Sequence, residues 1–212
     1  MSTFRPPAPE RLLLEGPAGA LEAAYEVPEG FTGERVALVC HPHPLFGGTM
    51  DNKVVVISAR ALQERGYATL RFNFRGVGRS AGSWDLGRGE ADDAMAAAQA
   101  LQARWPTAEL VIAGFSFGAY VATQLATRLP VRQLITIAPP VQRFDFSTLA
   151  LPQCPWLVVQ GDQDELVDHE AVLAWTRTLQ PAPTVAMLPG AEHFFHGRLN
   201  DLRTAIQEHL LP

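Results

Sequence analysis

A single serine, Ser116, lies between two glycines in the sequence GFSFG at residues 114–118. The apolar run Leu110 to Gly114 before it has the composition of a buried strand, and AYVATQLATRL after it has the composition of a helix. A serine in a sharp strand-to-helix turn is exposed as a nucleophile, and the residues two before and two after it must be nearly bare of side chain. Gly114 and Gly118 meet this requirement. The motif therefore predicts nucleophilic acyl chemistry at Ser116.

Four acidic residues follow the apolar run 156–160 within one loop. A serine nucleophile needs a general base, and a histidine base needs a carboxylate that fixes its tautomer. Asp164 is our candidate for this carboxylate, and Asp162 is the alternative, with a side-chain hydrogen bond that holds the turn as its expected role. Asp168 directly precedes HEAVLAW, so we expect it to cap that helix. Glu165 is expected to be solvated.

The candidate bases lie in the loop PGAEHFFH, residues 189–196. His193 is preferred, and His196 is expected to flank the pocket or to begin the last helix. His169 and His209 lie on predicted helices and carry no functional signal.

Short apolar runs alternate with longer segments rich in Ala, Leu and Gln from about Val36 onward. This alternation is typical of a mostly parallel sheet with helices on both faces, so the fold class is α/β. The strands are expected at Val36–Cys40, Ala68–Phe74, Leu110–Gly114, Leu134–Ala138, Trp156–Gln160 and Thr184–Leu188. The helices are expected at about Asp51–Arg65, Glu90–Arg104, Phe117–Arg128, His169–Thr178 and Leu199–Leu210. Residues 11–27 predict an antiparallel hairpin at the N-terminal edge of the sheet.

The composition suits one domain over residues 1–212, because 47% of the residues are hydrophobic and 18% are charged. The net charge of −5 and the absence of a basic run predict neither a nucleic-acid partner nor a membrane partner. Cys40 and Cys154 are isolated, and no leader-like or long apolar segment stands out, which favours a cytoplasmic protein. We therefore expect a small-molecule substrate and no cofactor.

Five segments resemble, in order, a family of small bacterial α/β hydrolases often called predicted hydrolases: CHPHPLFGGTMDNKVV, RFNFRGVGRSAGSWD, GFSFGAYVA, QGDQDELVD and GAEHFFHG. The likeness covers nearly the whole chain from about Val36. It implies an α/β-hydrolase fold and a triad of Ser116, Asp164 and His193, in the chain order Ser, Asp, His. Dienelactone hydrolases are more distantly similar, but their nucleophile is a cysteine where this chain has a serine.

The same resemblance implies an oxyanion hole made of two backbone N–H groups. One belongs to Phe117, which follows the nucleophile, and the other comes from the loop CHPHPLFGG. The two prolines of this loop have no N–H, which leaves His43 and Leu45. We prefer Leu45 because it begins the run that leads into a glycine turn. His41 and His43 resemble a metal-binding pair, but no third ligand stands nearby and we expect no metal.

Phe46, Phe194 and Arg75 are the candidates for lining the pocket. Arg75 lies in a glycine-rich loop without the spacing of a phosphate loop, so we favour a salt bridge for it over contact with an anionic substrate. Residues 139–155 are too few for a cap domain, which predicts an open site and a preference for short acyl chains.

These observations predict a serine hydrolase that cleaves small carboxylesters or thioesters through an acyl-enzyme on Ser116. Amide and peptide substrates use the same machinery and are alternatives. The alternative from another class is a catalytically silent α/β-hydrolase fold that binds a ligand or a partner, and the intact triad argues against it.

Overall fold

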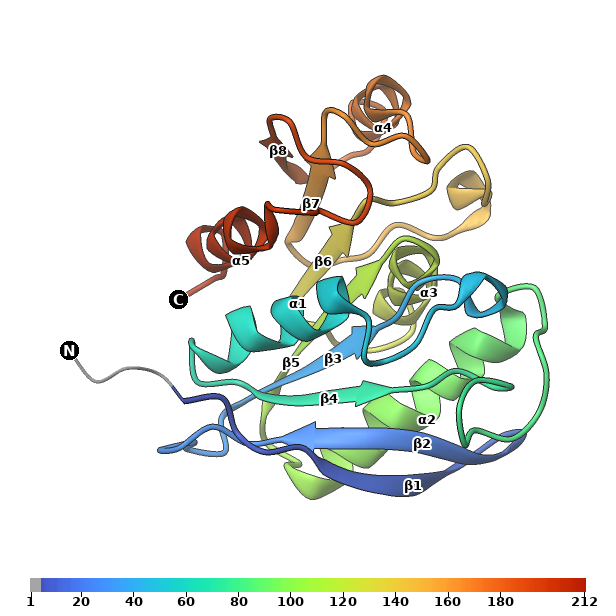
Figure 1. The fold of residues 1–212 in the computed structure, drawn as a ribbon, viewed down its shortest axis with the longest axis vertical. Coiled ribbons are helices and arrows are strands. Elements are labelled where there is room, and N and C mark those ends of the chain that lie inside the picture. Colours follow the sequence, from blue (N-terminus) through green and yellow to red (C-terminus); the bar gives the residue numbers. More distant parts are fainter. Residues whose placement is uncertain (1–4) are drawn as a thin grey trace.

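An eight-stranded sheet crosses the whole of the computed structural model, which describes residues 5–212 (Figure 1). The strand order is β1-β2-β4-β3-β5-β6-β7-β8. Strands β3 to β8 are parallel, whereas β1 and β2 are antiparallel to their neighbours and form the N-terminal edge. The strands are β1 (Glu10–Gly16), β2 (Gly19–Glu26), β3 (Arg35–Cys40), β4 (Ala68–Phe72), β5 (Glu109–Phe115), β6 (Gln133–Ile137), β7 (Trp156–Gly161) and β8 (Thr184–Leu188). The predicted strand sequence and the edge hairpin are therefore confirmed.

The helices lie where they were predicted, with different ends. They are α1 (Lys53–Gln63), α2 (Arg88–Arg104), α3 (Phe117–Ala126), α4 (His169–Thr176) and α5 (Leu199–Glu208). Helix α1 begins two residues later than predicted, because the Asn52 side chain accepts the Val54 N–H at 2.9 Å and makes Asn52 the N-cap. Two short 3₁₀ helices, Pro44–Phe46 and Phe146–Thr148, were not predicted.

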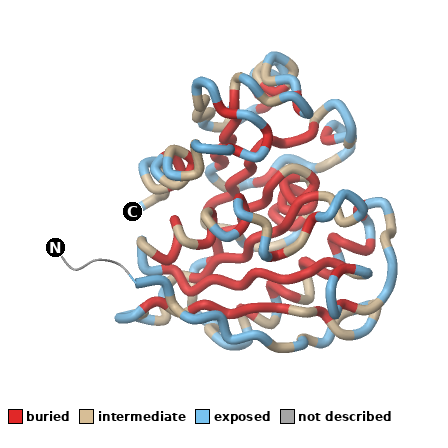
Figure 2. Tube along the Cα trace, in the orientation of Figure 1, coloured by how far each residue is buried: buried red, intermediate tan, exposed pale blue. Residues whose placement is uncertain are grey.

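Alternate residues of each central strand enter two separate hydrophobic cores. In β3, Val36, Leu38 and Cys40 pack with α2 and α3, whereas Ala37 and Val39 pack with α1 and α5. Both faces of the parallel strands are therefore covered, as their continuous apolar runs require (Figure 2). This double packing holds the carboxyl ends of the strands, and the loops that follow them, in fixed positions.

The segment 139–155 between β6 and β7 contains only the 3₁₀ helix Phe146–Thr148. It is too short for a cap domain, as the sequence predicted. Within residues 5–212, no helix has both the length and the apolar character needed to cross a bilayer.

Candidate active site

Ser116 occupies the turn between β5 and α3 with a positive φ of 53° and a ψ of −119°. This backbone conformation is strained for a residue with a side chain. It brings the chain so close to itself that a Cβ on Gly114 would lie 2.1 Å from the Gly118 carbonyl oxygen, and one on Gly118 would lie 2.4 Å from the Cys40 carbonyl oxygen. Glycine is required at both positions, as the sequence predicted.

Three side chains from three loops meet at Ser116. His193, in the β8–α5 loop, places Nε2 3.2 Å from Ser116 Oγ. Its Nδ1 lies 2.8 Å and 3.0 Å from the two carboxylate oxygens of Asp164, in the β7–α4 loop. Because a carboxylate only accepts hydrogen bonds, Nδ1 carries the proton and the Nε2 lone pair faces the serine hydroxyl. The arrangement can remove the hydroxyl proton from Ser116.

The Asp164 carboxylate is fully buried and receives hydrogen bonds from several donors. Oδ1 accepts the N–H groups of Leu166 at 2.9 Å and Val167 at 2.8 Å. Oδ2 accepts a hydrogen bond from the Gln160 side-chain amide at 3.1 Å. Burial alone would raise the pKa of Asp164, but the contact with His193 and the two backbone donors lower it overall. The carboxylate is therefore held in its charged form beside the imidazole.

The other acids of this loop support the same region in different ways. Asp162 Oδ1 accepts the Gly190 N–H at 2.6 Å, so it ties the β7–α4 loop to the loop that carries His193. Asp168 caps α4 by accepting the Glu170 N–H at 3.1 Å, as predicted. Glu165 is exposed, as expected, and its carboxylate also accepts the His193 backbone N–H at 3.1 Å.

His196 is exposed and lies 3.4 Å from the carboxylate of Glu192, four residues earlier. It precedes α5 and makes no hydrogen bond to Ser116.

His41 connects the loop after β3 to the end of β4. Its Nδ1–H donates to the Pro42 carbonyl at 2.7 Å, and its Nε2 accepts the Phe74 N–H at 3.0 Å. Burial lowers the pKa of His41 to about 3, although the Pro42 carbonyl opposes this change. Both ring nitrogens are occupied by backbone groups, so neither is available to a metal.

The side chain and the carbonyl of His43 organise the turn that follows. His43 Nδ1 accepts the Leu45 N–H at 3.2 Å, and the His43 carbonyl accepts the N–H groups of Phe46 and Gly48, both at 3.1 Å. The Leu45 N–H is therefore already engaged, and the Leu45 side chain points to solvent with 64% of its surface exposed. The His43 N–H has no acceptor within residues 5–212.

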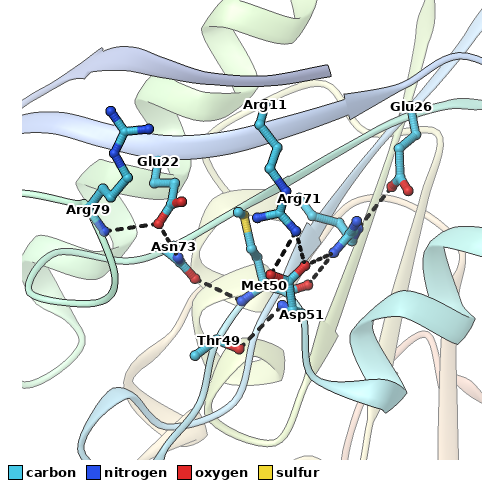
Figure 3. A network of polar contacts seen from close by, with 9 residues as sticks. All are labelled: Arg11, Glu22, Glu26, Thr49, Met50, Asp51, Arg71, Asn73 and Arg79. Carbon is cyan, nitrogen blue, oxygen red and sulfur yellow. Dashed lines mark hydrogen bonds and ion pairs between the residues drawn. The ribbon is translucent and has the colours of Figure 1, made fainter. Parts of the chain in front are cut away.

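A network of charged and amide side chains fixes the segment that joins this turn to α1 (Figure 3). The buried Arg71 guanidinium donates to Glu26 at 2.9 Å, to the Met50 carbonyl at 2.5 Å and to Asp51 at 3.0 Å. Asn73 Oδ1 accepts the Met50 N–H at 2.8 Å. Partial burial would raise the pKa of Asp51, but the hydrogen bonds from Arg11 and Arg71 lower it overall. Arg71 of β4 and Asn73, which follows β4, thus hold the carbonyl and the N–H of Met50, and two glutamates of β2 bind these two side chains.

A pocket of about 440 Å³ opens above Ser116 and His193. Its lining includes the aromatic side chains of Phe46, Phe144 and Phe194, as expected for Phe46 and Phe194, beside the aliphatic side chains of Leu166 and Val167. Arg75 is not among the lining residues. Its guanidinium instead forms two hydrogen bonds, of 2.8 Å and 2.9 Å, with the fully buried carboxylate of Asp93. The salt-bridge interpretation of Arg75 is correct, and its placement as a pocket residue is wrong.

Two residues of this region escaped the sequence analysis. Gln160 contacts Asp164, and its only signal in the sequence is that it is a polar residue closing the apolar run WLVV. Arg143 lines the pocket from the β6–β7 segment, and no motif marks it.

The likeness to known proteins extends over nearly the whole chain. Residues 37–210 match the model of a family described as the alpha/beta hydrolase domain. The chain belongs to this α/β hydrolase family. Uncharacterized protein RP471 of Rickettsia prowazekii is 38% identical over 211 residues, which cover 95% of this chain and 88% of that protein.

Solved structures resemble this α/β hydrolase over the same extent. XC6422 from Xanthomonas campestris, described as an α/β serine hydrolase without lid, superposes with a TM-score of 0.90 at 46% identity and covers 100% of both chains. An α/β serine hydrolase homologue from Coxiella burnetii superposes with a TM-score of 0.92 at 45% identity, covering 95% of this chain and 97% of that one. These likenesses confirm the predicted α/β-hydrolase fold and support hydrolase activity.

Proposed function

We propose that this α/β hydrolase cleaves small carboxylester or thioester substrates through an acyl-enzyme on Ser116. The observation that carries the proposal is the continuous hydrogen-bonded series from Ser116 Oγ to His193 Nε2, and from His193 Nδ1 to the Asp164 carboxylate. A serine hydroxyl is a weak nucleophile until a base accepts its proton, and this series supplies both the base and the group that orients it.

In the proposed reaction, Ser116 Oγ attacks the carbonyl carbon while His193 Nε2 takes the hydroxyl proton. The bond to the alcohol or thiol leaving group then breaks, and His193 returns the proton to that group. Water loses a proton to His193 and attacks the acyl carbon. The bond between this carbon and Ser116 Oγ then breaks, His193 returns the proton to Oγ, and the carboxylic acid leaves. Asp164 stays ionised throughout and stabilises the imidazolium that forms twice in the cycle.

The oxyanion formed in each half-reaction needs two preorganised donors. Phe117 is the first residue of α3, so its N–H has no acceptor within the helix. For the second donor we propose His43 in place of Leu45, because the Leu45 N–H already donates to His43 Nδ1 and the His43 N–H has no acceptor in the described part of the chain.

The decisive experiment is labelling with a fluorophosphonate, followed by peptide mapping and hydrolysis of p-nitrophenyl acetate. We expect the label on Ser116, and we expect Ser116→Ala to lose both labelling and hydrolysis. Ser83→Ala is the matched control, because Ser83 is an exposed serine outside the pocket. Hydrolysis that survives in Ser116→Ala would refute the proposal, and a wild-type protein that neither labels nor hydrolyses would favour a ligand-binding role for the fold.

A further inference from the structure

Arg143 brings a positive charge into the pocket that holds Ser116 and His193. It lies on the β6–β7 segment, which Figure 1 shows on the side of the molecule where the parallel strands end. Its backbone N–H donates to the Pro140 carbonyl at 3.0 Å, and this turn fixes the origin of the side chain. The guanidinium itself is exposed and faces solvent at the pocket.

Arg143 has no acidic ion-pair partner among residues 5–212, whereas Arg75, which follows β4, is paired with Asp93. No aspartate or glutamate is among the described residues that line the pocket. The pocket therefore holds a positive charge with no acidic residue among its described lining residues, although the net charge of the chain is −5.

The positive charge of Arg143 acts on His43, which lines the same pocket. Burial lowers the pKa of His43, and the positive charge of Arg143 lowers it further. The pocket wall also carries the aromatic side chains of Phe46, Phe144 and Phe194 and the aliphatic side chains of Leu166 and Val167. The pocket thus combines an apolar surface with one cationic group.

We propose that Arg143 binds a carboxylate carried by the substrate, so that the preferred substrates are esters with an apolar body and a free carboxylate. A guanidinium presents N–H groups in a planar fork that matches a carboxylate with two parallel hydrogen bonds. The carboxylate belongs either to the acyl part, as in the half-ester of a dicarboxylic acid, or to the alcohol part. This inference rests on the proposed function, because it assigns a substrate class to the same site.

Two pairs of esters show whether Arg143 binds a carboxylate on the acyl part or on the alcohol part of the substrate. In the acyl pair, p-nitrophenyl hydrogen adipate carries the charge and its methyl ester does not. In the alcohol pair, 4-acetoxybenzoate carries the charge and methyl 4-acetoxybenzoate does not. The quantity measured is the ratio of kcat/KM for the charged ester to kcat/KM for its neutral partner. Comparing this ratio between variants removes the intrinsic difference in reactivity within each pair.

Arg143→Gln should lower this ratio by about tenfold in one of the two pairs, because any effect that the variant has on both esters alike cancels in the ratio. Arg143→Lys should retain part of the preference for the charged ester, because lysine keeps the positive charge but lacks the planar guanidinium group. The wild-type ratio should also fall as salt is added, since the contact is exposed. Arg65→Gln is the matched control: it removes an exposed arginine at the end of α1, before β4, outside the pocket.

If Arg143→Gln leaves the ratio unchanged in both pairs, the inference is overturned. The proposed esterase function would still be supported if the wild type hydrolyses the neutral esters. An equal fall in Arg65→Gln would also overturn it, because only the overall charge would then matter. If wild-type protein hydrolyses neither neutral ester in a Ser116-dependent way, the proposed function fails and the inference fails with it.

Discussion

The side-chain amide of Gln160 donates to the Asp164 carboxylate at 3.1 Å, in the interior of the protein. The same nitrogen also faces the carbonyl oxygens of Gly161 at 3.1 Å and Val167 at 3.4 Å. All three neighbours are acceptors, so the nitrogen and not the oxygen of the amide must face them. Gln160 therefore joins the end of β7 to the acid that orients His193.

Gln160→Leu should change both stability and the pH dependence of activity. The loss of a donor leaves buried acceptors unpaired, which should lower the free energy of unfolding by about 1–3 kcal/mol. The Asp164 carboxylate, with one donor fewer, should have a higher pKa, so activity should be lost at a higher pH on the acid side of the kcat/KM profile. Gln63→Leu is the matched control, because the buried Gln63 amide donates to Thr69 at 2.8 Å, away from the site. An unshifted profile in Gln160→Leu would reduce Gln160 to a purely structural role.

Asp164→Asn and Asp162→Asn separate the two candidate acids. Asp164→Asn should lower kcat by about 10⁴-fold, because the amide favours the wrong tautomer of His193. Asp162→Asn should retain most of the activity, since the asparagine oxygen can still accept the Gly190 N–H. Steady-state kinetics and thermal unfolding of both variants provide the measurement. The reverse order of activity in folded proteins would exchange the two assignments.

The second oxyanion donor can be tested with proline, which removes a backbone N–H. His43 has a φ of −54°, close to the angle that proline imposes, so His43→Pro fits the observed backbone. We expect His43→Pro to lower kcat by about 10²–10³-fold relative to His43→Ala, which loses the same ring but keeps the N–H. Equal kcat values for the two variants would exclude the His43 N–H.

The buried His41 should make stability depend on pH. Burial lowers the pKa of His41 in the folded protein to about 3, from 6.5 for an unperturbed histidine. Between these values the unfolded chain binds a proton that the folded protein does not bind. The stabilisation is therefore complete above pH 6.5 and is lost as the pH falls, by about 1.4 kcal/mol per pH unit.

Urea unfolding between pH 7.5 and about pH 5.5 measures this dependence and stays above the range in which free aspartates and glutamates titrate. His41→Gln should be less stable at pH 7.5 and less sensitive to pH. His196→Gln, which removes an exposed histidine, should follow the wild type. A His41→Gln protein with the wild-type pH dependence would contradict the assignment.

The size of the pocket should limit the length of acyl chain that still raises kcat/KM. Each added methylene should raise kcat/KM by about fourfold, the equivalent of about 0.8 kcal/mol, until the 440 Å³ pocket is filled. Longer chains should gain nothing further. A series of p-nitrophenyl esters from acetate to palmitate, each below its solubility limit, tests this, and a maximum at palmitate would contradict the open site.

The sequence predicted the features of this protein that depend on local pattern. The strands and helices follow from apolar periodicity, and the turn at Ser116 follows from the spacing of Gly114 and Gly118. The Ser, Asp, His order came from the family resemblance. The start of α1 was predicted too early, because Asn52 is the N-cap of the helix and the Asp51 side chain binds Arg11 and Arg71.

Features that depend on side-chain orientation between distant segments could not be predicted. The orientation of the His43 ring decides that the Leu45 N–H is engaged, and nothing in the sequence determines that orientation. Arg143 and Gln160 reach the site only because β6 and β7 are neighbours in the sheet. Arg75 follows β4 and does not line the pocket, because the buried carboxylate of Asp93 binds it.

The positive φ of Ser116 lowers the stability of the folded protein at the position that carries the proposed nucleophile. A residue with a side chain in this conformation destabilises the native state by about 1–3 kcal/mol, and glycine would relieve most of that strain. Glycine, however, carries no hydroxyl. A glycine at residue 116 would therefore give a more stable protein that lacks the hydroxyl on which the proposed reaction depends.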